Sequence, residues 1–212
     1  MATSRAVIFD FGGVFTVPVP EFAAGIAAEF GLQREDWAPR FLETEAHFAG
    51  RTFATTDMIP VLASSLAPLV GGRAHELAEV LLRRIFVNGE AGRPREQMYA
   101  FARGLHENGF AIGLLSNGPA DSEEVNLRPI REAGFVDASV LSGRDGTGKP
   151  HPEAYRLILK RLGGPPPENA YFIDDQLQNI VAARALGICS FHFEGNDTAD
   201  LEADVRRWAN TA

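Results

Sequence analysis

The chain has 212 residues, of which 45% are hydrophobic and 23% charged, and its net charge at pH 7 is −8. This composition is typical of a folded globular protein. It argues against nucleic acid or an anionic membrane as a partner, because binding either one needs a basic surface and no segment of the sequence is a basic stripe.

Five short apolar runs predict β-strands, and helical patterns fill most of the chain between them. The runs are nearly continuous in apolar residues, as in parallel strands that helices cover on both faces. The predicted strands are residues 5–10, 110–116, 138–142, 170–174 and 188–193. The predicted helices between and after them are residues 94–108, 121–133, 152–163, 177–187 and 198–210. This alternation predicts an α/β fold with a parallel sheet.

The interval between the first two predicted strands contains no convincing strand. Apolar residues recur there at helical spacing, as at Phe22, Ile26 and Phe30, which predicts amphipathic helices. The stretches VFTVPVP and GEAGRPRE join this interval to the sheet, and both contain Pro or Gly. We therefore expect two units, a core of residues 1–16 and 92–212 that contains the sheet and a helical insertion of residues 17–91.

Polar residues follow four of the predicted strands. Asp10 ends the first, Ser116 ends the second, Lys149 follows the third, and Asp174 and Asp175 end the fourth. In an open parallel sheet, ligands bind outside the carboxyl ends of the strands. Each residue alone has an ordinary explanation, such as a turn or a helix cap. Their meeting at one edge of the sheet indicates an active site.

This set of side chains suits phosphoryl transfer to an aspartate. One oxygen of Asp10 can attack phosphorus, and the other can bind Mg²⁺ together with Asp175. Ser116 can donate hydrogen bonds to the phosphoryl oxygens, and Lys149 supplies a positive charge between two anions. Asp174 and Asn179 then either complete the surroundings of the metal or orient Lys149.

The stretches FDFGGV, LLSNG, GKPHPEAY and FIDDQLQNI resemble, in the same order, the motifs of the haloacid dehalogenase-like hydrolase superfamily. The resemblance implies a Rossmann-like core, a helical cap formed by the helical insertion, a Mg²⁺ ion and an aspartyl-phosphate intermediate. The implied catalytic residues are Asp10, Ser116 and Lys149. The implied phosphate-binding residues are Ser116, Asn117, Gly12, Gly13 and Lys149. The implied metal ligands are Asp10, the carbonyl of Gly12, Asp174 and Asp175, with Asn179 behind them.

The superfamily also includes dehalogenases, which attack carbon with the same aspartate and need no metal. They usually carry serines where this chain has Asp174 and Asp175, so the acid pair favours a phosphatase. A dehalogenase would also place a cap arginine near the halide. Arg40 and Arg51 are candidates for that role, so this alternative stays open.

One position departs from the phosphatase pattern. Phosphatases of the superfamily commonly carry a second aspartate two residues after the nucleophile, which protonates the leaving group and activates water. This chain has Gly12 there, and such acid–base catalysis is typically worth roughly 10² to 10⁴ in rate.

Three interpretations of Gly12 follow. The substrate has a leaving group that departs easily, as the anomeric hydroxyl of a sugar phosphate does. Alternatively, a side chain of the cap, Glu43, Glu45 or His47, replaces the aspartate when the cap closes. Finally, the protein is a weak enzyme that binds a phosphorylated ligand or another protein.

A single cysteine, Cys189, precludes a disulfide bond within the chain, as is typical of cytoplasmic proteins. It lies in the apolar stretch GICSFHF, which predicts a core position on a buried strand. The first predicted strand leaves no room for a signal peptide before it, and no apolar run reaches the roughly 18 residues of a membrane span. We therefore expect a cytoplasmic, Mg²⁺-dependent phosphatase of a small phosphorylated metabolite.

Overall fold

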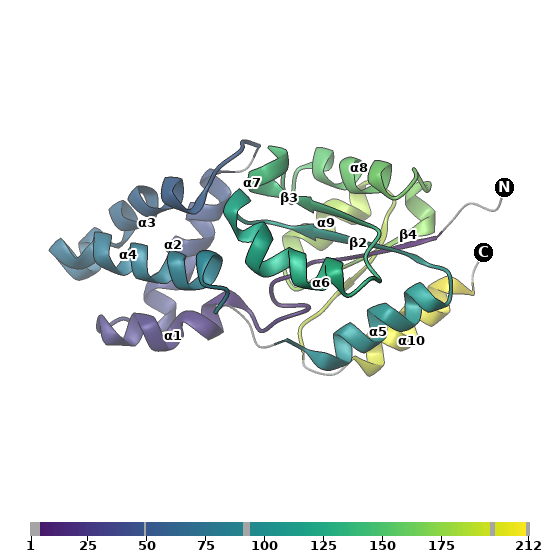
Figure 1. The fold of residues 1–212 in the computed structure, drawn as a ribbon, viewed down its shortest axis with the longest axis horizontal. Helices are drawn as coiled ribbons and strands as arrows, with labels where there is room; N and C mark the ends of the chain where they lie inside the picture. Colours follow the sequence, from purple (N-terminus) through teal and green to yellow (C-terminus); the bar gives the residue numbers. More distant parts are fainter. Residues whose placement is uncertain (1–4, 49, 91–93, 196–197, 211–212) are drawn as a thin grey trace.

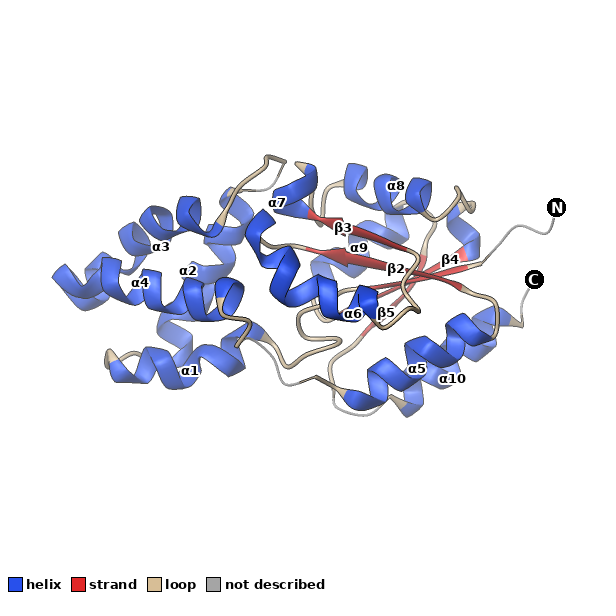
Figure 2. Ribbon diagram, in the orientation of Figure 1, coloured by secondary structure: helices blue, strands red, loops and turns tan. Residues whose placement is uncertain are grey.

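The computed structural model describes residues 5–48, 50–90, 94–195 and 198–210. Its centre is a parallel sheet between two layers of helices (Figures 1 and 2), the α/β, Rossmann-like arrangement that the sequence predicts. The strands lie in the order β3-β2-β1-β4-β5. Their bounds are Ala6–Phe9 for β1, Ala111–Ser116 for β2, Ala138–Leu141 for β3, Ala170–Asp174 for β4 and Cys189–His192 for β5. All five predicted strands are confirmed.

The central strand, β1, is buried on both faces and pairs with β2 and β4. Val7 and Phe9 pack on one face with helices α5, α6 and α10, whereas Ala6 and Ile8 pack on the other with α8 and α9. A strand covered on both sides needs an unbroken apolar run, which is why all four residues of β1, AVIF, are apolar. The five helices are α5 Glu96–Glu107, α6 Arg128–Glu132, α8 Pro152–Arg161, α9 Leu177–Ala185 and α10 Ala199–Ala209.

The remaining short helices of the core lie in the loops. Their bounds are η3 Ala120–Ser122, η4 Glu123–Leu127, α7 Ser142–Asp145 and η5 Pro167–Asn169. The single helix predicted for residues 121–133 is therefore three consecutive segments, η3, η4 and α6, of different helical pitch. Within the described ranges, no helix combines the length and apolar character that crossing a bilayer requires.

The prediction that Cys189 is a core residue is wrong. Its strand, β5, is one of the two edge strands of the sheet, and the Cys189 side chain is exposed. An apolar run does not reveal which strand lies at the edge of a sheet, and an edge strand is only partly covered by its neighbours.

The helical insertion lies beyond the carboxyl ends of the strands, at the left of Figure 1. Its elements are α1 Val19–Glu29, α2 Arg34–His47, α3 Thr55–Val70, η1 Gly71–Arg73, α4 Ala74–Leu82 and η2 Arg83–Val87. These helices share a hydrophobic core of their own, which includes Trp37, Leu62 and Leu81. The division of the chain into two units at residues 16 and 92 stays a prediction.

Two crossing segments connect the helical insertion to the sheet, and they lie side by side. Thr16 and Pro94 form an isolated antiparallel bridge, and the backbone N–H of Arg95 donates to the carbonyl of Phe15 at 2.8 Å. Residues 91–93 of the predicted returning stretch lie outside the described residues. A further contact joins Thr55 at the start of α3 to Asp121, whose Oδ1 accepts hydrogen bonds from both the N–H and the hydroxyl of Thr55.

Candidate active site

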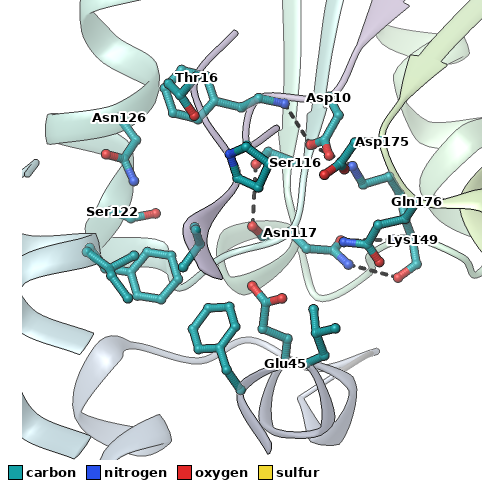
Figure 3. Close-up of a pocket in the computed structure, with 18 of the residues that line it drawn as sticks. Asp10, Thr16, Glu45, Ser116, Asn117, Ser122, Asn126, Lys149, Asp175 and Gln176 are labelled. Carbon is teal, nitrogen blue, oxygen red and sulfur yellow. Dashed lines mark hydrogen bonds and ion pairs between the residues drawn. The ribbon is translucent and has the colours of Figure 1, made fainter. Parts of the chain in front are cut away.

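A cavity of about 280 Å³ lies where the carboxyl ends of the strands meet the helical insertion (Figure 3). Side chains from the loops after β1, β2 and β4 form one wall, and α2 contributes to the other. Six residues predicted for the site line this cavity, namely Asp10, Gly12, Ser116, Asn117, Lys149 and Asp175. The fold therefore brings together residues that are far apart in the sequence.

Asp10 follows β1 directly, and one acceptor and two donors hold it in place. Its backbone N–H donates to the carbonyl of Ile173 in β4 at 2.9 Å. Its Oδ1 accepts from the N–H of Phe11 at 2.6 Å and lies 2.6 Å from Nζ of Lys149. Among the described residues, none donates a hydrogen bond to Oδ2 of Asp10, so this oxygen is free for a ligand.

Lys149 is buried between two carboxylates. Its Nζ lies 2.6 Å from Oδ1 of Asp10 and 2.7 Å from Oδ2 of Asp174, and the residue is only 3% exposed. Burial lowers the pKa of Lys149, but the negative charges of Asp10 and Asp174 outweigh this and hold the pKa above its ordinary value. Lys149 is therefore a fixed positive charge beside Asp10.

Asn117 fixes the backbone of Lys149. Its Nδ2 donates to the carbonyl of Lys149, and its Oδ1 accepts from the N–H of Lys149, both at 2.9 Å. Asn117 was predicted to bind phosphate, but both its Nδ2 and its Oδ1 are used to hold the backbone of Lys149.

The structure gives the two neighbouring aspartates different surroundings. Asp174 is fully buried, and both of its oxygens accept hydrogen bonds from the protein. Oδ1 accepts from the N–H of Gln176 at 2.8 Å and from Nδ2 of Asn179 at 3.0 Å, and Oδ2 accepts from Lys149. Of the two uses predicted for Asp174, these contacts favour orienting Lys149.

Asp175 keeps one oxygen without a partner. Its Oδ1 is buried and makes no hydrogen bond within the described part of the chain. Burial and the charge of Asp174 raise the pKa of Asp175 to about 6. The backbone carbonyl of Asp175 lies 3.0 Å from Nε2 of His192 in β5, a contact that the sequence did not suggest.

The acidic cluster fits a magnesium ion. One carboxylate oxygen from each of Asp10, Asp174 and Asp175 lies within 4.8 Å of the other two. Burial raises the pKa of Asp10 well above its ordinary value, even though Lys149 opposes the shift. Three carboxylates against one lysine leave an excess of negative charge, and an all-oxygen donor set with an unpartnered carboxylate oxygen is what Mg²⁺ prefers.

The two glycines of the first loop differ in their freedom. Gly13 has a φ of +80°, and a Cβ atom there would collide with the carboxylate of Asp175. Gly12 has no positive φ, and a Cβ atom there would have nothing within 4 Å. A side chain is therefore excluded at position 13 and sterically tolerated at position 12.

Ser116, at the end of β2, offers its hydroxyl to the cavity. The side chain is 6% exposed, and among the residues that the structure describes its Oγ has one hydrogen-bond partner, the carbonyl of Asn117, at a long distance of 3.4 Å. A phosphoryl oxygen in the cavity would be a better acceptor for this donor.

Of the three acid–base candidates predicted in the helical insertion, Glu45 is the one that lines the cavity. Figure 3 shows its carboxylate pointing from α2 into the cavity, toward Asn117. Glu43 and His47 are exposed on the same helix. Burial raises the pKa of Glu45 to about 8, with Lys149 lowering it and Asp175 raising it further.

Neither arginine predicted for a dehalogenase lines the cavity. Arg40 donates to the carbonyls of Ser65 and Asp36 within the helical insertion. Arg51 lies over the ring of Phe48, with the guanidinium carbon 5.9 Å from the ring centre. The arginine that does line the cavity is Arg34 of α2.

Several lining residues were not predicted from the sequence. The polar ones are Thr16, Arg34, Ser122, Asn126 and Gln176. The apolar ones include Val19, Phe41, Leu42, Ile85, Phe86, Leu127 and Leu141. Most belong to the helical insertion and to η3 and η4, and no motif marks them because their position depends on how those helices pack on the core.

The chain is similar to proteins of one family. The sequence profile of the haloacid dehalogenase-like hydrolases matches residues 4–187. The chain is 36% identical over 199 residues to a phosphoglycolate phosphatase of Salmonella typhi, which covers 86% of this chain and 78% of that protein. It is 31% identical over 100 residues to the sesquiterpene phosphatase astK of Aspergillus oryzae, covering 47% of this chain and spanning only 50% of that protein's length.

The fold is also similar to that of solved structures of this family. The solved structure of an L-2-haloacid dehalogenase superposes with a TM-score of 0.72, covering 97% of this chain and 100% of that one. The two sequences are 20% identical, so this likeness establishes a shared fold.

Proposed function

Because the chain belongs to the haloacid dehalogenase-like hydrolases, we propose that it is a Mg²⁺-dependent phosphatase in which Asp10 is the nucleophile. The observation that carries the proposal is the arrangement around Asp10. One of its oxygens is held by Lys149, a carboxylate oxygen of Asp175 lies within 4.8 Å of the Asp10 carboxylate, and Oδ1 of Asp175 has no hydrogen-bond partner among the described residues. The relatives named as phosphatases support the same activity.

The residues of the chain divide the first half of the reaction among them. The carboxylate of Asp10 attacks phosphorus, the bond from phosphorus to the leaving oxygen breaks, and an aspartyl phosphate forms on Asp10. Lys149 offsets the negative charges that meet at this point, and Ser116 donates to a phosphoryl oxygen. Asp174 and Asn117 hold Lys149 in place through the contacts described above.

Asp10, Asp175 and the carbonyl of Gly12 would hold the Mg²⁺ ion, with Asp174 and Asn179 behind them. When bound, Mg²⁺ neutralises phosphoryl charge and orients the group for transfer. The donor set supports this assignment, since the oxygens of Asp174 are already taken by Lys149, Gln176 and Asn179, while Oδ1 of Asp175 has no partner among the described residues.

We propose that the helical insertion acts as the cap of the enzyme, because α2 contributes a wall of the cavity opposite the strand ends. The lining joins apolar side chains to a few polar ones, which suits a small organic phosphate with both kinds of surface. A sugar phosphate is one candidate. The unpaired, exposed Cys189 is in keeping with a cytoplasmic location.

The dehalogenase alternative loses support at the acid pair at the end of β4, which has the charge of a metal site. The arginines do not separate the two activities, because Arg40 and Arg51 lie away from the cavity whereas Arg34 lines it. A protein that only binds a phosphorylated ligand is the second alternative. It would have less use for a buried lysine held between the nucleophile and Asp174.

The test is a comparison of two activities with and without metal. The wild-type protein is expected to hydrolyse 4-nitrophenyl phosphate with Mg²⁺, to lose this activity in EDTA, and to lose it in the Asp10→Asn variant. Metal-independent release of halide from a 2-haloacid, without phosphatase activity, would establish the dehalogenase instead. Binding of Mg²⁺ and phosphate with no turnover on aryl, sugar or nucleotide phosphates would establish the binding protein.

A further inference from the structure

We propose that Glu45 of α2 is the general acid and base of this enzyme, acting from the cap in place of the aspartate that position 12 lacks. The inference rests on the proposed phosphatase function and adds a catalytic residue to it. Three features of the cavity carry the argument: which groups can move a proton, where the leaving oxygen must lie, and what surrounds Glu45.

The titratable side chains that line the cavity leave one candidate for proton transfer. Within the described part of the chain they are Asp10, Arg34, Glu45, Lys149 and Asp175. Asp10 is the nucleophile, Asp175 is a proposed metal ligand, and Lys149 is held as a cation between two carboxylates. Arg34 does not give up its proton in a protein. Glu45 remains.

The geometry of phosphoryl transfer places the leaving oxygen on the side of Glu45. The attacking and leaving oxygens lie roughly in line on opposite sides of phosphorus. Asp10 attacks from the strand ends, so the leaving oxygen faces the wall formed by the helical insertion. Figure 3 shows the Glu45 carboxylate on that wall, across the cavity from Asp10 and Asp175.

The surroundings of Glu45 leave its carboxyl group available. The side chain makes no hydrogen bond or ion pair with any other described residue, although it is partly buried in the cavity wall. The charged groups that act on it from the core are Lys149 and Asp175, and Arg34 lines the same cavity from α2. Burial raises the pKa of Glu45 to about 8, so the proton needed for the first step is present at neutral pH.

The two half-reactions then balance. In the first, Asp10 bonds to phosphorus while the bond to the leaving oxygen breaks, and the electron pair goes to that oxygen. Glu45 gives it a proton, which yields the alcohol and a Glu45 carboxylate. In the second, Glu45 takes a proton from a water whose oxygen attacks phosphorus. The bond from phosphorus to Asp10 breaks, inorganic phosphate forms, and both carboxyl groups return to their initial states.

The test uses Glu45→Gln, which keeps the size of the side chain, with Glu43→Gln as the matched control on the exposed face of α2. For each protein, kcat/KM is measured on 4-nitrophenyl phosphate, a good leaving group, and on an alkyl phosphate, a poor one. Because kcat/KM reports steps up to formation of the phosphoenzyme, it isolates the role of the acid. Glu45→Gln should lose roughly 10² or more on the alkyl phosphate and much less on the aryl phosphate. Glu43→Gln should match the wild type.

A rescue variant separates proton transfer from a structural role. An aspartate at position 12 fits sterically, since a Cβ atom there meets nothing within 4 Å. Gly12→Asp introduced into the Glu45→Gln protein should raise kcat/KM on the alkyl phosphate at least roughly tenfold. The wild-type kcat/KM on that substrate should also fall as the pH rises above about 8, where Glu45 loses its proton.

Two results would overturn the proposal. One is an equal loss on both substrates in Glu45→Gln, and the other is no loss beyond that of Glu43→Gln. If Glu45→Gln does not fold, a wild-type pH profile on the alkyl phosphate without an alkaline fall has the same meaning. Failure of the phosphatase proposal itself looks different, because the wild type would then show no Mg²⁺-dependent hydrolysis of either substrate.

Discussion

A Cβ atom placed on Gly13 would lie 2.2 Å from Oδ2 of Asp175, far inside van der Waals contact. The loop after β1 and the loop after β4 therefore touch, with the backbone of one against the carboxylate of the other. Gly13 also has a φ of +80°, which residues with a side chain rarely adopt. The glycine thus allows the Asp175 carboxylate to lie against the backbone of the loop that follows Asp10.

The first prediction concerns this contact. In Gly13→Ala the methyl group displaces the Asp175 carboxylate, so the Mg²⁺ concentration that gives half-maximal phosphatase activity should rise roughly 10- to 100-fold, as when the support of a metal ligand is lost. The matched control is Gly31→Ala, at a glycine outside the cavity that has a φ of +77° and where a Cβ atom would meet nothing within 4 Å. It should retain the wild-type metal dependence. An unchanged Mg²⁺ dependence in Gly13→Ala would contradict the assignment of Asp175 as a metal ligand.

A second prediction follows from the burial of Lys149. In Lys149→Met, Asp10 and Asp174 lose the cation they share, and loss of one partner from a buried ion pair typically costs about 3 to 5 kcal/mol of the free energy of unfolding. Phosphatase activity should be lost as well. Urea unfolding measures the first effect, with Lys160→Met on the exposed side of α8 as the control.

The loss of stability in Lys149→Met should depend on pH. In Lys149→Met, Asp10 loses the cation that opposes the upward shift of its pKa, so its charged form becomes costly and the variant is most destabilised at neutral pH. As the pH falls and Asp10 binds a proton, the free energy of unfolding of the variant should approach that of the wild type. A difference that stays constant between pH 7 and pH 4 would show that the lysine stabilises the fold by packing alone.

A third prediction concerns the stability of the protein without Mg²⁺. The pKa of Glu45 in the folded protein is about 8, above the ordinary value of 4.5. The folded state therefore keeps a proton that the unfolded state loses as the pH rises from about 4.5. The stabilisation that the protonated Glu45 contributes to the free energy of unfolding therefore declines as the pH rises above about 4.5, and it is lost as the pH passes about 8.

Glu45→Gln removes this dependence because glutamine does not ionise. The free energy of unfolding of the variant minus that of the wild type should be more positive at pH 9 than at pH 5, as measured by urea unfolding in EDTA. Glu43→Gln, on the exposed face, should show no such trend. Parallel pH profiles for the wild type and Glu45→Gln would mean that Glu45 is not buried against the cavity wall in solution.

The sheet and most helices were predictable because the relevant signals are local. The continuous apolar run at Ala6–Phe9 requires cover on two faces, and a parallel sheet places the residues after its strands at one edge. This is why Asp10, Ser116 and Lys149 were expected together, and they do line one cavity. Cys189 was misplaced since nothing local distinguishes an edge strand from a central one.

The other wall of the cavity was not predictable in the same way. Residues 43 and 47 lie near one face of α2 and residue 45 lies roughly opposite, as follows from 3.6 residues per turn. The sequence does not say which face turns toward the core, because that depends on packing within the helical insertion. Arg34, Asn126 and the apolar lining share this difficulty, as does the contact of His192 with the carbonyl of Asp175.

The central claim is that Asp10 carries the phosphoryl group during turnover, and trapping that intermediate tests it most directly. The wild-type protein is mixed with 4-nitrophenyl phosphate bearing a radiolabelled phosphoryl group, quenched in acid and digested into peptides. Mg²⁺-dependent label is expected on the peptide that contains Asp10, released by hydroxylamine as an acyl phosphate would be, and absent from Asp10→Asn. Turnover without label on that peptide, or stable label on another residue, would contradict it.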